Sequence, residues 1–140
     1  MKKDEDCIFC KIIDGKIPSA KIYEDEKVLA FLDIMPINKG HTLVVPKNHS
    51  KNLLEDDDKD ISACMKAVKK VANAVMKATN AQGFNMGVNT EKAAGQAVFH
   101  THFHVIPRFE NDGLHHWPGG KYQDGEMEKV RQSIASRVGK

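Results

Sequence analysis

Three histidines alternate with other residues in the segment 100–106, whose sequence is HTHFHVI. Successive side chains of a β-strand point to opposite faces, so a strand here places His100, His102 and His104 on one face, each about 6.5–7 Å from the next. Imidazole acts as a metal ligand, a nucleophile and an acid or base near neutral pH. Because three unpaired polar rings on an apolar strand would be costly to bury, the alternation indicates a chemical site.

Two chemistries suit three aligned imidazoles. One is a zinc site, since histidines spaced by one residue on a strand are common zinc ligands. The other is nucleophilic catalysis, because a neutral imidazole attacks an electrophile and a substituted imidazolium leaves readily. The segment alone is compatible with both.

Cysteine offers a second candidate site. Cys7 and Cys10 are separated by two residues, a spacing found in zinc sites and in redox dithiols. The helix–sheet pattern that accompanies a thioredoxin-like dithiol is absent around them. The third cysteine, Cys64, occupies an apolar position of a helical pattern, so we expect it in the core.

Composition limits the class of protein. The chain has 140 residues, 41% of them hydrophobic, with a net charge of +2 from interspersed charges. This size fits a single domain over residues 1–140. No apolar run approaches the ~20 residues of a membrane span, and no basic surface for nucleic acid is indicated. The first residues lack the apolar stretch of a signal peptide and three cysteines make no disulfide framework, so we expect a cytoplasmic protein.

Periodicity predicts the elements that position these groups. Helices are expected at 7–13, at 57–79, where apolar residues recur every three or four positions, and in a C-terminal tail at 124–138. Strands are expected at 21–24, 28–34, 41–45, 84–89 and 99–108. The order of elements predicts an α+β fold with a largely antiparallel sheet and the helices packed on one face. The tail helix needs a partner surface to cover its apolar side.

The histidine segment, followed by Pro107 and Arg108, resembles the signature of the histidine triad (HIT) family. The resemblance continues through residues 7–13, 17–20, 29–34, 40–49 and 95–99, and is greatest to the Hint-like branch of nucleotide hydrolases. Residues 116–119 look like that branch's terminal segment. The resemblance implies a five-stranded antiparallel sheet with a long helix and a short N-terminal helix, and a homodimer whose sheets join into ten strands.

The same resemblance implies an activity. It is hydrolysis of nucleoside 5′-phosphoramidates of the AMP type through a covalent nucleotidyl-histidine on His102. His104 would hold the phosphoryl oxygens and help to protonate the leaving group, and His41 would add an imidazole beside the phosphate. Attack requires a neutral nitrogen on His102, so its other nitrogen should donate to a fixed acceptor such as a backbone carbonyl. A dinucleoside polyphosphate hydrolase and a non-catalytic nucleotide-binding regulator are the alternatives, as is a zinc hydrolase using all three histidines.

Binding residues also carry over by resemblance. Asn89, Gly95 and Gln96 would direct amides toward the phosphate. Ala97 occupies a position where Hint-like proteins commonly have serine, and loss of the serine hydroxyl costs about 1–3 kcal/mol if nothing replaces it. The purine nucleoside would contact a set of mainly apolar side chains, in which Asp33 accepts hydrogen bonds from the ribose hydroxyls. The set is Ile8, Phe9, Ile12, Phe31, Asp33, Ile34 and Leu43. Core packing is the alternative for the apolar members, and a turn or cap role for the acid.

For the cysteines, the resemblance implies one structural zinc held by Cys7, Cys10, His49 and His100, because two thiolates and two imidazoles close a tetrahedral shell. This assignment divides the triad between a metal and a phosphate. No organic cofactor is implied. His115 and His116 are expected on the surface or in the tail, with a contact to the partner subunit's site as the alternative.

Overall fold

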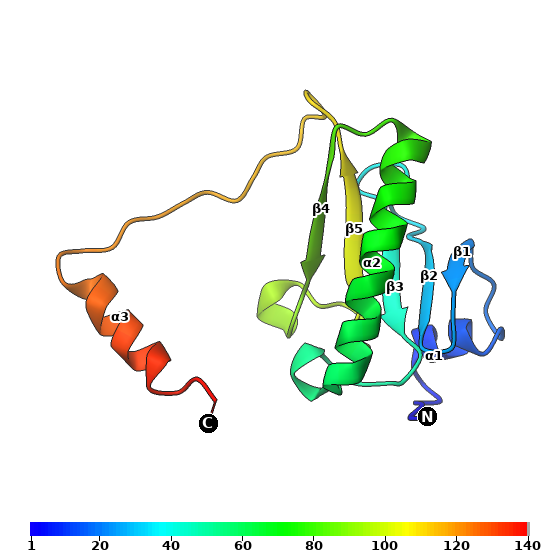
Figure 1. Cartoon of the computed structure of the whole chain (residues 1–140), viewed down its shortest axis with the longest axis horizontal. Coiled ribbons are helices and arrows are strands. Elements are labelled where there is room, and N and C mark those ends of the chain that lie inside the picture. The colour runs from blue at the N-terminus through cyan, green and yellow to red at the C-terminus, as the bar shows by residue number, and fades with distance from the viewer. Residues whose placement is uncertain (140) are drawn as a thin grey trace.

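Five strands form one antiparallel sheet in the order β1-β2-β3-β5-β4 in the computed structural model, which describes residues 1–139 (Figure 1). All five predicted strands are present. Their bounds are β1 Lys21–Glu24, β2 Val28–Leu32, β3 Thr42–Pro46, β4 Gly83–Val88 and β5 Phe103–Arg108. The fifth strand begins later than expected, so His100 and His102 lie in the segment that leads into it and only His104 lies within it.

One face of the sheet is covered by the long helix α2, Asp58–Thr79 (Figure 1). Its buried side chains recur every three or four residues and contact the inward residues of β2, β3 and β5, as the periodicity predicts. Cys64 lies in this core, fully buried. Asp58 and Asp60 occupy the first turn, where their negative charge interacts favourably with the positive end of the helix dipole.

The opposite face is covered at one end by the short helix α1, Ile8–Ile13. Phe9 and Cys10 pack there against alternate residues of β2 and β3, Leu29, Phe31, Leu43 and Val45. The expectation that the helices share one face is therefore wrong. The reason is that the central strands are apolar on both faces, so each face needs a cover.

The C-terminal tail leaves the sheet after β5 and extends away from it to α3, Glu126–Ala135 (Figure 1). The predicted tail helix is present but shorter at both ends. Its apolar residues Met127, Val130 and Ile134 are exposed. Within residues 1–139, no helix has the length and apolar character needed to cross a membrane.

Candidate active site and metal cluster

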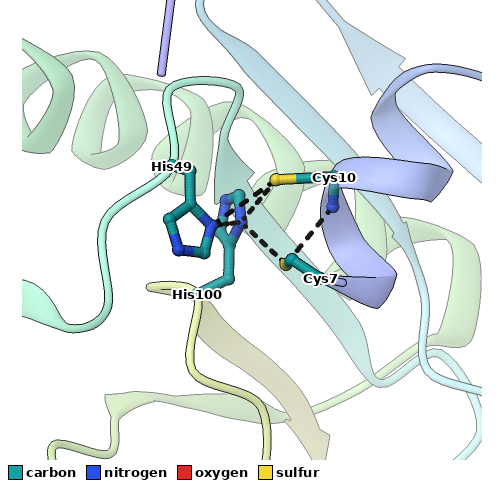
Figure 2. A group of neighbouring side chains, drawn as sticks. All are labelled: Cys7, Cys10, His49 and His100. Atoms are coloured by element: carbon teal, nitrogen blue, oxygen red, sulfur yellow. Dashed lines mark hydrogen bonds between the residues drawn. The ribbon is translucent and has the colours of Figure 1, made fainter. Parts of the chain in front are cut away.

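Four side chains of types that can ligate a metal converge beside α1, and we call them the Cys/His cluster: Cys7, Cys10, His49 and His100 (Figure 2). Cys7 caps the N-terminus of α1 and Cys10 lies one turn later, while His49 follows β3 and His100 precedes β5. The Nδ1 atom of His100 lies 3.4 Å and 3.6 Å from the two sulfur atoms. The Nδ1 atom of His49 lies 3.5 Å from Cys10 Sγ and 3.1 Å from His100 Nδ1.

The backbone orients these donors. His100 Nε2–H donates to the Pro46 carbonyl at 2.7 Å, which leaves a lone pair on Nδ1 facing the thiols. Backbone N–H groups of Asp4 and Cys10 point at the two sulfur atoms at 3.5 Å and 3.4 Å. Such donors stabilise a thiolate more than a thiol.

The donor set fits zinc. Zinc–sulfur bonds of about 2.3 Å and zinc–nitrogen bonds of about 2.0–2.1 Å put neighbouring ligand atoms of a tetrahedral site about 3.3–3.8 Å apart. The measured separations of 3.1–3.6 Å lie close to that range. Burial raises the pKa of the Cys10 thiol to about 11 and lowers the pKa of His100 to about 4. The imidazole is thus ready to coordinate, and a cation is required to deprotonate the thiol.

A second group, the three-histidine cluster, contains His41, His102 and His104. His41 immediately precedes β3, and its Nε2 lies 2.9 Å from Nδ1 of His104 on the neighbouring β5. The rings of His102 and His104 have centroids 5.0 Å apart. Gly40 has φ +101° and passes so close to α2 that a Cβ would lie 2.8 Å from Thr79 Cγ2, which favours glycine before His41.

Hydrogen bonds fix where the protons of this cluster lie. The Ile37 backbone N–H donates to His41 Nδ1 at 3.1 Å, so a neutral His41 carries its proton on Nε2. That proton is donated to His104 Nδ1, which places the His104 proton on Nε2. The Nε2 atom of His104 is buried and has no partner among residues 1–139. An unpaired buried donor costs free energy that a bound acceptor would recover.

His102 has the opposite arrangement. Its Nδ1–H donates to the His100 carbonyl at 2.7 Å, so the lone pair of a neutral ring is on Nε2. The structure thus supplies the backbone acceptor that was predicted for His102. Burial lowers the pKa of His41 and His102, and lowers that of His104 to about 4, so all three rings are neutral at pH 7. The cluster therefore offers one lone pair, on His102, and one N–H donor, on His104, on neighbouring rings.

The residues expected around a nucleoside fall into two groups. Phe9, Phe31 and Leu43 are buried in the core under α1, with Ile12 packed against them, whereas Ile8 and Ile34 are 46% and 95% exposed. Only the exposed pair offers much free apolar surface. Asp33 caps a turn by accepting from the Met35 N–H at 2.9 Å, while its other oxygen lies 3.8 Å from His41 Nε2.

The loop after β4 contains Gln96, which was expected to direct its amide toward a phosphate. The Gln96 side chain is buried, accepts from the Glu91 N–H at 2.9 Å, and donates to the carbonyls of Lys51 and Val98 at 2.8 Å and 3.1 Å. Both the oxygen and the nitrogen of this amide are thus engaged in hydrogen bonds within the protein. Gly95 adopts φ +90° beside the Asn89 side chain, and Ala97 is exposed.

A hollow of about 520 Å³ lies on the β4 side of His104. Asn89 lines it, as do three residues that were not predicted to belong to the site, Asn85, Arg108 and Trp117, with His115 and His116 from the tail. Arg108 holds the start of the tail through Asp112, with bonds of 2.8 Å and 3.1 Å. The spacing of that pair gave no signal in the sequence, because Arg108 ends a strand and Asp112 lies in the turn after it. The backbone contact of Ile37 gave none either.

A family model described as the HIT domain matches residues 14–111. The chain belongs to the HIT family. A HIT-like protein of Borreliella burgdorferi is 51% identical over 91% of this chain and 92% of its own. An adenylylsulfatase of Arabidopsis thaliana is 47% identical over 78% of this chain and 55% of its own, and an adenosine 5′-monophosphoramidase of Schizosaccharomyces pombe is 40% identical over 94% and 98%.

Solved HIT structures share the fold. This HIT protein is similar to SMU.412c of Streptococcus mutans, with a TM-score of 0.92 and 43% identity over 97% of this chain and 87% of that one. A zinc-bound histidine triad protein of Mycobacterium smegmatis gives a TM-score of 0.75 and 36% identity over 94% of both chains. The α+β fold with five antiparallel strands, a long helix and a short N-terminal helix is thus confirmed.

Proposed function

We propose that this HIT protein hydrolyses nucleoside 5′-phosphoramidates of the AMP type through a nucleotidyl intermediate on His102. The observation that carries the proposal is the pairing of a free Nε2 lone pair on His102 with an unpaired Nε2–H on His104. The first suits attack on phosphorus, and the second suits a hydrogen bond to the phosphoryl group. The monophosphoramidase among the relatives supports the choice of substrate.

The reaction would run in two displacements at phosphorus. His102 Nε2 forms a bond to the α-phosphorus while the phosphorus–nitrogen bond to the amine breaks, and the leaving nitrogen takes up one proton from solvent. His104 Nε2–H stabilises the charge that develops on the phosphoryl group or on the leaving atom. A water molecule then attacks the same phosphorus, the bond to His102 breaks, and the nucleoside monophosphate leaves while the water's proton passes to solvent.

Nucleotide recognition would use both exposed and polar residues. Ile8 and Ile34 offer apolar surface to a purine base, and Asp33 has one oxygen that is free to accept a ribose hydroxyl. His41 acts indirectly, by fixing the His104 proton through their 2.9 Å contact. Asn89 lies beside His104 on the wall of the hollow, where its amide can meet a phosphoryl oxygen.

A steady-state assay with adenosine 5′-monophosphoramidate tests the proposal. We expect turnover by the wild type and a loss of at least about a thousandfold in His102→Ala, because the nucleophile is removed. Cys64→Ala is the matched control, since it alters a buried residue of α2 outside both clusters. Absence of turnover in the wild type, or full turnover in His102→Ala, contradicts the proposal.

For the metal, we infer that Cys7, Cys10, His49 and His100 hold one structural zinc ion. The ligand separations and the fixed His100 tautomer support this, as does the zinc-bound relative. Four protein ligands would leave the ion no open position for substrate, so its contribution when bound is to join α1 to the segments around β3 and β5.

A second substrate class is favoured by the hollow beside His104. Its volume of about 520 Å³ gives room for a leaving group much larger than ammonia, such as the second nucleotide of a dinucleoside polyphosphate. Comparison of kcat/KM for the phosphoramidate and for diadenosine polyphosphates distinguishes the two. A higher value for the polyphosphates would make this the principal activity.

We further propose a homodimer in which two sheets join through β4. The strand lies at an edge of the sheet, where Phe84 and Met86 are each 43% exposed. Val130 and Ile134 of α3 form a second apolar surface that a partner copy would cover. Light scattering should give twice the monomer mass, and a monomer at all concentrations would rule the dimer out.

A further inference from the structure

His100 belongs to both clusters, through different atoms. Its buried ring points Nδ1 at Cys7 and Cys10, and its carbonyl accepts the Nδ1–H of His102 at 2.7 Å. The bond from its Nε2 to the Pro46 carbonyl prevents the ring from turning the other nitrogen to the thiols. The position of this one residue therefore affects both the metal ligands and the tautomer of the nucleophile.

The peptide that carries this carbonyl is not held by the sheet. The pairing of β5 with its neighbours begins at Phe103, after the peptide between His100 and Thr101. A backbone bond from Thr101 N–H to the Ser50 carbonyl, at 3.1 Å, anchors the segment. Ser50 directly follows His49, so this anchor also depends on a residue of the Cys/His cluster.

A second contact runs through Phe9. This residue lies between the two cysteines in α1, and its ring meets those of His100 and His102 edge-on at centroid distances of 5.9 Å and 5.1 Å. An α1 of six residues is too short to be stable alone, so its place on the sheet depends on its tertiary contacts. An ion bound by Cys7 and Cys10 would fix the helix, and with it the ring that packs on His102.

We propose that His100 is a positioning residue through which the bound metal sets the tautomer of His102. The inference rests on the proposed function and on the proposed zinc ion. With the metal in place, the His100 carbonyl stays where it holds the proton on His102 Nδ1 and leaves Nε2 free. When the metal is lost, the segment 100–101 has one anchor fewer, and His102 can carry its proton on Nε2, which removes the nucleophile's lone pair.

The test compares zinc-loaded, zinc-depleted and zinc-reloaded wild-type protein at one neutral pH. Long-range ¹H–¹⁵N NMR spectra report which nitrogen of His102 carries the proton, and kcat and KM are measured on the same samples. We expect depletion to convert His102 from the Nδ1–H form to a mixture with about 90% or more of the Nε2–H form. Since activity scales with the competent fraction, kcat should fall at least about tenfold, with a smaller effect on KM. Reloading should restore both.

A variant keeps the test valid if the depleted protein unfolds. His100→Ala leaves three zinc ligands and the backbone carbonyl, and we expect it to lower kcat at least about tenfold and to mix the His102 tautomers although the protein stays folded. His100→Cys restores a fourth ligand and should recover part of both. Cys64→Ala, which removes a thiol outside the cluster, should leave the tautomer and kcat unchanged.

An Nδ1–H form of His102 and an unchanged kcat in folded, zinc-depleted protein and in His100→Ala would overturn the inference. Failure of the proposed function is distinguishable, because it appears as absent turnover in the zinc-loaded wild type. The NMR comparison then still reports whether the metal sets the tautomer.

Discussion

The Cys/His cluster and the three-histidine cluster both contact Phe9 and both use largely buried imidazoles, yet their hydrogen bonds differ. In the first, His100 turns a lone pair toward two thiols, so donors converge on one point that suits a cation. In the second, a lone pair on His102 lies beside an N–H on His104, which suits an electrophile bearing negative oxygens.

The difference comes from the backbone. Pro46 accepts from Nε2 of His100, the His100 carbonyl accepts from Nδ1 of His102, and the Ile37 N–H donates to His41. The chemistry of each histidine thus depends on which of its two ring nitrogens is hydrogen-bonded to the main chain, because the other nitrogen is then left to act.

Removal of both thiols should destroy the Cys/His cluster. We expect the double variant Cys7→Ala/Cys10→Ala to fall from stoichiometric to trace zinc, and to lose more than about 4 kcal/mol of unfolding free energy, because lost metal sites belong to the most destabilising changes. Metal analysis and denaturant unfolding measure the two effects. Cys64→Ala should keep its zinc, and unchanged zinc in the double variant would contradict the ligand assignment.

Removal of the donor in the three-histidine cluster should affect catalysis instead. His104→Ala is expected to lower kcat about 10²–10³-fold, because removal of one hydrogen-bond donor to a developing charge typically has an effect of this size. The variant should keep its zinc. His104→Gln keeps an N–H donor and should retain more activity. Equal kcat in the wild type and His104→Ala would show that the buried Nε2–H has no role in turnover.

The pH dependence should separate this cluster from ordinary imidazole. Burial lowers the pKa of His102 and lowers that of His104 to about 4. A lowered pKa keeps the rings neutral at lower pH, so kcat/KM should stay constant through the usual imidazole value of about 6.5 and fall only at lower pH. A half-maximal point at or above about 6.5, in protein still folded by circular dichroism, would contradict the account.

The smallest effect is expected at Ala97. A hydroxyl at this exposed position should raise kcat up to about tenfold in Ala97→Ser, which corresponds to about 1.4 kcal/mol from one added hydrogen bond. Ala93→Ser is the matched control, since Ala93 is an exposed alanine of the same loop. If both variants or neither gain activity, position 97 does not limit turnover.

Periodicity and spacing predicted the order of elements well, because strand alternation and helical repeats are local properties. The start of β5 could not be predicted, since the segment before it is shaped by contacts of His100 with Pro46 and the thiols, far away in sequence. The side of the sheet taken by α1 was also missed, because a short amphipathic helix has no signal for which face it covers.

Within the candidate site, the histidines themselves were evident from the sequence but the positions of their protons were not. The tautomer of His41 depends on a backbone N–H of Ile37, which any residue except proline supplies. The inward turn of the Gln96 amide likewise depends on carbonyls of Lys51 and Val98, and carbonyls carry no side-chain signature.

The most direct test of the central claim is the mass of the protein during its first turnover. Rapid quenching in alkali, where a phosphorus–imidazole bond survives, followed by peptide mass spectrometry should find one nucleoside monophosphate group on the peptide containing His102. The adduct should be absent from His102→Ala. Turnover without any adduct, or an adduct on another residue, would contradict the role of His102 as the nucleophile.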